Sequence, residues 1–235
     1  MLHMIEPNPA SAIDPDSARV PWPLTPGTVE RWEPAPLAID PWLVLRLSGH
    51  RRRDTVPPPI WEAARRMAER AAQLVEPRAV VRVSRVAATG SDAARRVDGF
   101  AFSGRAVATL LAGCPSAVAF VLTLGPRLEA ETASLGERRE LLEAFLLDTA
   151  GWAAIETAAR DLRLGLAARA RSRGWRLTHR LAPGYLDWPL DEQRALLGLV
   201  GDAAGSVQLS EHGVLIPFKS ISGLFGLAPA RAAAS

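Results

Sequence analysis

The chain has 235 residues, enough for one large domain or two small ones, and its 48% apolar content is that of a globular protein. A formal charge of +3 and the short run Arg51–Arg53 are too small to indicate a nucleic-acid surface. The single cysteine, Cys114, excludes a disulfide framework, a zinc cluster or a cysteine-ligated iron–sulfur cluster within the chain. No signal peptide and no apolar stretch of membrane-spanning length are apparent, so we expect a cytoplasmic protein with no metal site.

Residues 1–40 are predicted to form a proline-rich arm that is extended or poorly ordered. Twelve of the nineteen prolines precede residue 60, and Pro21-Trp22-Pro23 excludes a helix locally. We expect this arm to lie across the body of the protein or across a partner. Residues 41–228 are then the folded unit, and residues 229–235 a disordered tail.

The first part of the folded unit mixes helices and strands. Pro41–Leu47 is a short apolar element, and apolar positions at three- and four-residue spacing predict a helix over Ile60–Val75. Ala79–Val86 is β-branched and partly alternating, which indicates a strand. Ser103 is expected to be the N-cap of a helix that runs through Leu111.

The remaining elements show little strict alternation of strand and helix. They are, in order, a buried strand Ala117–Leu124, a helix with Pro126 at its first position, a long helix over about 139–173, an extended segment 176–180, a helix Pro189–Val200 and two short strands, Val207–Leu209 and Val214–Phe218. This pattern predicts an α+β fold, with a twisted, largely antiparallel sheet and flanking helices.

The segment Arg180-Leu181-Ala182-Pro183-Gly184-Tyr185 carries the sharpest functional signal. Proline and glycine hold a tight bend, an arginine fits a carboxylate bidentately, and a tyrosine offers a ring face and a hydroxyl beside a cationic ligand. Pro-Gly by itself also marks an ordinary turn, so these residues alone leave a purely structural role open.

Two further motifs follow the bend at a defined distance. Trp188-Pro189-Leu190-Asp191-Glu192-Gln193 opens a helix, and Ile216-Pro217-Phe218-Lys219-Ser220-Ile221-Ser222-Gly223 comes about 25 residues later. This order resembles the activation (reactivation) domain of cobalamin-dependent methionine synthase, in particular its free-standing members. The likeness covers about residues 40–228, and Thr123-Leu124-Gly125-Pro126 with Glu129 and Leu147-Asp148 resemble the same family.

The resemblance implies a function in methionine biosynthesis. Such domains bind S-adenosylmethionine without a Rossmann unit, and this chain has no Gly-x-Gly-x-x-Gly segment that opens a helix after a strand. The implied reaction is the reductive methylation of cob(II)alamin, which reactivates a corrinoid-dependent methyltransferase. The chain has no corrinoid-binding Asp-x-His-x-x-Gly segment and no redox centre, so a partner protein is expected to carry the corrinoid and a flavodoxin or ferredoxin to supply electrons.

Site roles come from the same resemblance, and no catalytic side chain is implied. The ligand carboxylate would be bound by Arg180, the adenosine by the backbone around Ala182, Pro183 and Gly184, and Tyr185 would lie close to both. Ser222 and Gly223, with Ser220, would line the far wall. Glu156 is a candidate acidic contact, and the alternative is that it belongs to a solvated helix face with Asp148 and Trp152. Lys219 would contact corrin propionates or a partner, or would simply be solvated.

Other functions remain open at the level of sequence. Leu224 and Phe225 stand where the large methionine synthases have an aromatic hydroxyl, and Gly174 stands where an acidic contact is expected. These differences favour the alternative of a non-catalytic module that clamps a corrinoid protein. A third reading is an unrelated α+β enzyme that uses the bend for another carboxylate ligand.

Overall fold

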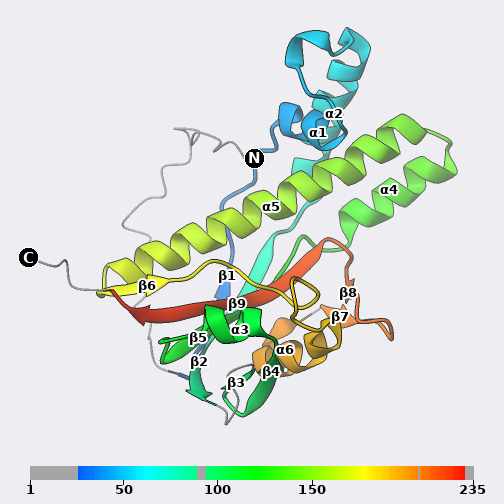
Figure 1. Cartoon of the computed structure of the whole chain (residues 1–235). Helices are drawn as coiled ribbons and strands as arrows, with labels where there is room; N and C mark the ends of the chain where they lie inside the picture. The colour runs from blue at the N-terminus through cyan, green and yellow to red at the C-terminus, as the bar shows by residue number, and fades with distance from the viewer. Residues whose placement is uncertain (1–25, 89–93, 206, 231–235) are drawn as a thin grey trace, which may run out of the picture.

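The computed structural model describes residues 26–88, 94–205 and 207–230. Within them the protein is an α+β fold with one main sheet of seven strands, all paired antiparallel (Figure 1). The sheet order is β4-β3-β2-β5-β9-β6, and β1 pairs with β2. Its strands are β1 (Val29–Trp32), β2 (Arg78–Ala88), β3 (Ala94–Val97), β4 (Phe100–Ser103), β5 (Ser116–Thr123), β6 (Trp175–Leu177) and β9 (Ser220–Pro229). A separate hairpin joins β7 (Gln208–Leu209) and β8 (Leu215–Ile216).

Helices cover both faces of the sheet (Figure 1). One face carries α1 (Pro41–Leu47), α2 (Pro58–Leu74), α4 (Arg127–Glu137) and the 31-residue α5 (Leu141–Arg171); the other carries α3 (Arg105–Leu110) and α6 (Gln193–Val200). No helix among the described residues combines the length and the apolarity that crossing a bilayer requires.

The central strand β5 shows why two cores form. All eight of its residues are buried. Val118, Phe120 and Leu122 point into the core beneath α5, whereas Ala117, Ala119 and Val121 point into the core beneath α6. Alternate residues of a strand face opposite sides of a sheet, so a strand covered on both faces is apolar throughout.

The N-terminal segment differs from the expectation of an arm that ends at residue 40. Val29–Trp32 forms a strand that pairs with β2, where Trp32 lies opposite Ala79. Leu37 and Ile39 are buried in the core beneath α5. The Asp40 side chain accepts a hydrogen bond from the Trp42 backbone N–H at 2.9 Å and caps α1. The folded body therefore includes residues before 41. The predictions for residues 1–25 and 231–235 lie outside the described residues.

The predicted helices and strands are otherwise confirmed in type, with two changes at the caps. Pro126 is the N-cap of α4 and not its first residue. Ser103 ends β4 instead of capping a helix, and Gly104 is the N-cap of α3. The donors at the start of α3 are instead satisfied by the distant Asp187, which accepts from the backbone of Arg105 at 2.7 Å.

Candidate functional site

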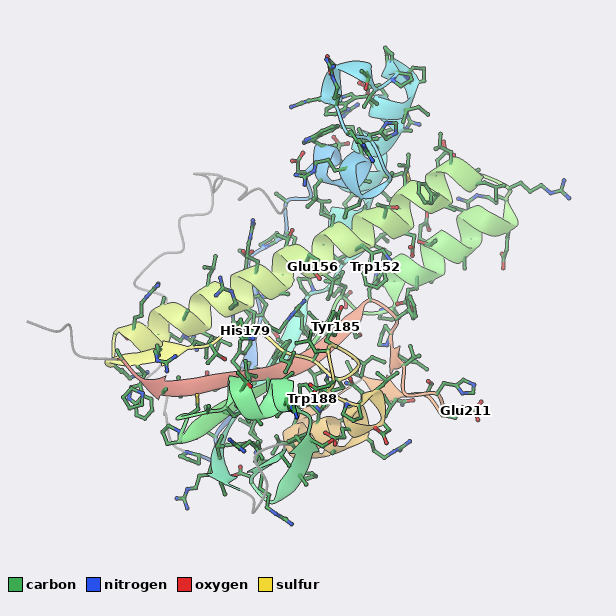
Figure 2. The ribbon with its side chains drawn as sticks, in the orientation of Figure 1. Trp152, Glu156, His179, Tyr185, Trp188 and Glu211 are labelled. Carbon is green, nitrogen blue, oxygen red and sulfur yellow. The ribbon has the colours of Figure 1, made fainter. Side chains whose placement is uncertain are left out.

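A groove of about 260 Å³ lies between α5 and the segment that follows β6. Three arginines, one glutamate and one histidine meet in it over an apolar floor, so it suits a small ligand with both charged and apolar parts. Figure 2 shows Glu156 on α5 and His179 on the segment after β6. The lining residues are Glu156, Ala159, Arg160, Arg163, His179, Arg180 and Phe225.

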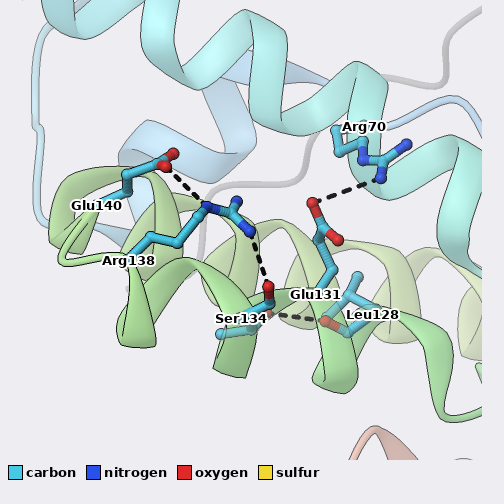
Figure 3. Close-up of polar contacts among 7 residues, drawn as sticks. Arg70, Leu128, Glu131, Ser134, Arg138 and Glu140 are labelled. Atoms are coloured by element: carbon cyan, nitrogen blue, oxygen red, sulfur yellow. Dashed lines mark hydrogen bonds and ion pairs between the residues drawn. The ribbon is translucent and has the colours of Figure 1, made fainter.

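A larger surface crease, of about 400 Å³, lies between α2 and α4. Its charged side chains already pair with one another: Arg70 with Glu131 at 3.4 Å, and Arg138 with Glu140 at 2.8 Å (Figure 3). Arg138 also donates to the Ser134 hydroxyl. Because these groups are satisfied, the smaller groove is the better candidate for a ligand site.

The groove contains one predicted pair of site residues. Arg180 Nη2 lies 3.5 Å from Glu156 Oε1, which brings the predicted cation and the predicted acidic contact together. Arg180 Nη1 is buried and has no hydrogen-bond partner among the described residues. A buried unpaired donor costs free energy, so an acceptor placed beside this N–H group would be stabilising.

The bend that follows Arg180 is anchored on β9. Leu181 and Leu224 exchange two backbone hydrogen bonds, of 3.1 and 2.8 Å. Directly beneath the crossing lies Gly223, where an added Cβ would be 2.5 Å from the Leu181 carbonyl oxygen and 3.0 Å from the Phe120 ring. Gly223, which belongs to the motif that ends in Ser-Gly, therefore lets the segment around Leu181 pass close over β9. This close contact explains why the two motifs occur together.

The bend itself is closed by its own backbone. Gly184, at φ +84°, donates to the Trp188 carbonyl at 2.8 Å, and Tyr185 donates to the Ala182 carbonyl at 3.2 Å. Pro183 is buried, whereas Tyr185 is 64% exposed and lies outside the groove lining. These backbone hydrogen bonds hold the bend, and the exposed side chain of Tyr185, labelled in Figure 2, can contact a second molecule.

Side chains just after the bend fasten it to the opposite core. Trp188 is 1% exposed and packs edge-on against Phe102. Its indole N–H donates to Glu192 at 2.8 Å, and the same carboxylate accepts from the backbone N–H and hydroxyl of Ser103. These contacts fix the position of the bend relative to β4 and α6.

Asp187 gives this anchor a pH dependence. Its pKa is lowered by hydrogen bonds from the backbone N–H of Ala106 and then of Arg105. Because the folded-state pKa lies below the unfolded value, the carboxylate stabilises the fold above about pH 3.9, and this contribution is lost as the pH falls through the lowered value.

Asp187→Asn is therefore expected to destabilise the protein at about pH 6 and to have little effect once the pH lies well below the lowered folded-state pKa of Asp187. Urea unfolding of the two proteins across this range measures the difference. A difference that stays constant with pH would contradict the assignment.

Lys219, the only lysine of the chain, occupies a different place from the one expected. It is 1% exposed, and its ammonium lies 2.7 Å from Asp148 Oδ1 and 4.3 Å from the centre of the Trp152 ring. Its backbone N–H donates to Glu129 at 2.7 Å. The expectations that Lys219 is solvated, or contacts a corrinoid or a partner, are corrected. Its ammonium pairs with Asp148 on α5 and its backbone bonds to Glu129 on α4, so the residue joins both helices to the start of β9.

The two serines of the same motif are also buried. Ser220 donates its hydroxyl to Thr123 at 2.8 Å, and Ser222 accepts from Gln193 at 2.5 Å. Neither serine lines the groove, contrary to the expectation that Ser220 and Ser222 form its far wall, and Lys219 does not line it either. Ser222 instead joins β9 to α6, which accounts for the glutamine at the start of that helix.

Sequence reasoning missed two groove residues. Arg160 and Arg163 follow Glu156 at spacings of four and seven, which place all three on one face of α5. Once Glu156 is a candidate site residue, this helical spacing also identifies Arg160 and Arg163 as candidates. Phe225 also lines the groove, although the sequence indicated only that it lacks the hydroxyl found in the large methionine synthases. No group of three or more metal-binding side chains is found among the described residues.

Comparison with family models and with curated proteins finds no match for this sequence. Comparison with solved structures finds the crystal structure of the MetH reactivation domain bound to AdoHcy, with a TM-score of 0.60. The match covers 88% of this chain and 80% of that chain at 16% sequence identity. The antiparallel sheet, its flanking helices and this match together show that the chain has the fold of the MetH reactivation domain.

Proposed function

We propose that this protein binds S-adenosylmethionine in the groove between α5 and the segment that follows β6, and that it reactivates a corrinoid-dependent methyltransferase. The fold is shared with a reactivation domain whose crystal structure holds AdoHcy, the demethylated form of that ligand. The observation that carries the proposal is the opposed pair of Arg180 and Glu156 in the groove.

These residues fit the ligand chemically. An amino-acid end carries a carboxylate and an ammonium, which match a guanidinium and a carboxylate held 3.5 Å apart. The unpaired Arg180 Nη1 would gain an acceptor. Entry of the ligand would then replace the internal ion pair with two ion pairs to the ligand.

The bound ligand would supply a methyl group on a positively charged sulfur. No proton transfer by a side chain of this protein is required. Its residues would hold the methyl group toward the partner and limit the access of water. Tyr185 and Leu186, 64% and 84% exposed, lie at the tip of the rigid bend, where they would meet the corrinoid carried by a partner protein. A flavodoxin- or ferredoxin-type donor would supply the one electron that converts cob(II)alamin to cob(I)alamin.

Calorimetric titration with S-adenosylmethionine tests the ligand directly. Arg180→Ala is expected to weaken binding at least about tenfold, since a lost charge-assisted hydrogen bond costs about 1.5 to 3 kcal/mol. Tyr185→Phe is the matched control, because this exposed side chain lies outside the groove lining, and its affinity should stay near that of the wild type. Equal binding by the wild type and Arg180→Ala would contradict the site.

A clamp without methyl transfer is the second candidate. The exposed apolar side chains at the bend favour it, since Leu190, which lies beside Gly184, is 49% exposed in addition to Tyr185 and Leu186. Tight complex formation with a corrinoid protein, together with no detectable binding of S-adenosylmethionine in the complex, would support the clamp over the methyl-donor site.

A further inference from the structure

The groove carries an excess of positive charge. Arg160, Arg163 and Arg180 line it, and Glu156 is the one acidic residue among its lining residues. Glu156 already pairs with Arg180 at 3.5 Å. Two guanidinium groups on α5 are therefore left without a carboxylate inside the groove.

The positive charges of Arg160 and Arg163 are only weakly neutralised by neighbouring carboxylates. Arg160 is 54% exposed and has only a long contact of 3.8 Å with Asp161, its neighbour in sequence. Arg163 forms no ion pair within the described part of the chain. The excess charge thus acts on whatever enters the groove.

We propose that Arg160 and Arg163 are specificity-determining residues that make the groove favour a neutral sulfur over a positively charged one. This inference rests on the proposed function. The methyl donor carries a sulfonium, whereas its demethylated product, S-adenosylhomocysteine, carries an uncharged thioether at the same place. The two ligands otherwise have the same charged groups, so the arginines discriminate between them through the sulfur alone.

The size of the groove makes this discrimination effective. Both arginines line a groove of about 260 Å³, so a charge on a ligand inside it acts on both guanidinium groups, and at a separation of about one Debye length, roughly 8 Å at physiological ionic strength, salt screens it only in part. Repulsion of a sulfonium by each arginine at such a distance is worth about three- to fivefold in affinity near a protein surface.

The same charge favours methyl transfer in the forward direction. In that step the sulfur–carbon bond breaks, its electron pair stays on sulfur, and the methyl carbon bonds to the electron pair of cob(I)alamin. The sulfur loses its positive charge as the step proceeds. Nearby guanidinium groups therefore destabilise the bound donor more than the transition state, which lowers the barrier. The consequence is strong inhibition by the product.

Calorimetry with the two ligands, at low salt and without a partner, tests the inference. The wild type is expected to bind S-adenosylhomocysteine about tenfold more tightly than S-adenosylmethionine. In the double variant Arg160→Gln/Arg163→Gln this ratio should approach one, chiefly through tighter binding of S-adenosylmethionine. In the wild type the ratio should also fall when salt is raised to about 0.5 M.

Two controls separate charge from other effects. Arg160→Lys/Arg163→Lys retains both charges and should retain the ratio. Arg171→Gln removes one exposed charge from the same helix outside the groove lining and should leave the ratio unchanged.

The outcomes distinguish this inference from the proposed function. If neither ligand binds the wild type, the proposed function fails, and this inference fails with it. If both ligands bind but the double variant keeps the wild-type ratio, the proposed function stands and the charge selection is wrong. Equal weakening of both ligands in the double variant would also overturn it, because the arginines would then contact the shared parts of the ligand.

Discussion

Asp148→Ala is expected to lower the free energy of unfolding by about 3 kcal/mol, because it leaves a buried ammonium without its counter-charge. Lys219 is 1% exposed, and its ammonium lies 2.7 Å from Asp148. The aromatic rings at 4.3 and 5.3 Å, Trp152 and Phe218, attract the cation but do not replace a carboxylate. Urea unfolding followed by circular dichroism measures the loss.

The reciprocal change should cost less. Lys219→Met removes the buried charge and keeps a long apolar side chain, while Asp148, 45% exposed, returns to water. We expect a loss of about 1 kcal/mol for Lys219→Met, and Asp148→Ala/Lys219→Met should be more stable than Asp148→Ala alone. Additive losses in the double variant would show that the two side chains do not interact.

The second large effect is expected at Gly223. An alanine Cβ there would lie 2.5 Å from the Leu181 carbonyl oxygen, closer than real contacts permit. The backbone crossing between Leu181 and Leu224 would have to open, and we expect Gly223→Ala to destabilise the protein by about 3 kcal/mol. Because this crossing sets the position of Arg180, ligand affinity should fall as well.

Gly165→Ala is the matched control for this substitution. Gly165 lies within α5 and has no atom within 4 Å of an added Cβ. Alanine is the better helix former, so this variant should be more stable than the wild type by up to about 1 kcal/mol. If Gly223→Ala unfolds at the same urea concentration as the wild type, the close crossing over β9 is not as the structure describes.

The local elements followed well from residue patterns. The periodicity of α2, the apolar composition of β5 and the helical character of α5 are short-range properties of the chain, and each is confirmed. The spacing of two motifs also led to the fold, which the match to the MetH reactivation domain bears out at 16% identity. The assignment of individual residues to a ligand site stays a prediction.

The long strand β9, which like β5 lies between two layers of helices, was missed because Ser222, Gly223 and Gly226 interrupt its apolar run. Eight of its ten residues are buried, so it shows no alternation of polar and apolar positions. The sequence therefore identified its first residues as a motif without indicating a strand. The same covering of both faces explains why Lys219 and Ser222, read as polar groups beside a ligand, prove to be buried and internally bonded.

The residues alone determined the α+β class and the presence of a rigid bend beside an arginine, because both depend on local conformational preferences. Only the tertiary structure decided which charges meet. Glu156 and Arg180 are joined by the packing of α5 against the segment after β6, and Asp187 caps a helix more than 80 residues before it. Such pairings depend on how distant segments pack together, so no spacing within the chain could predict them.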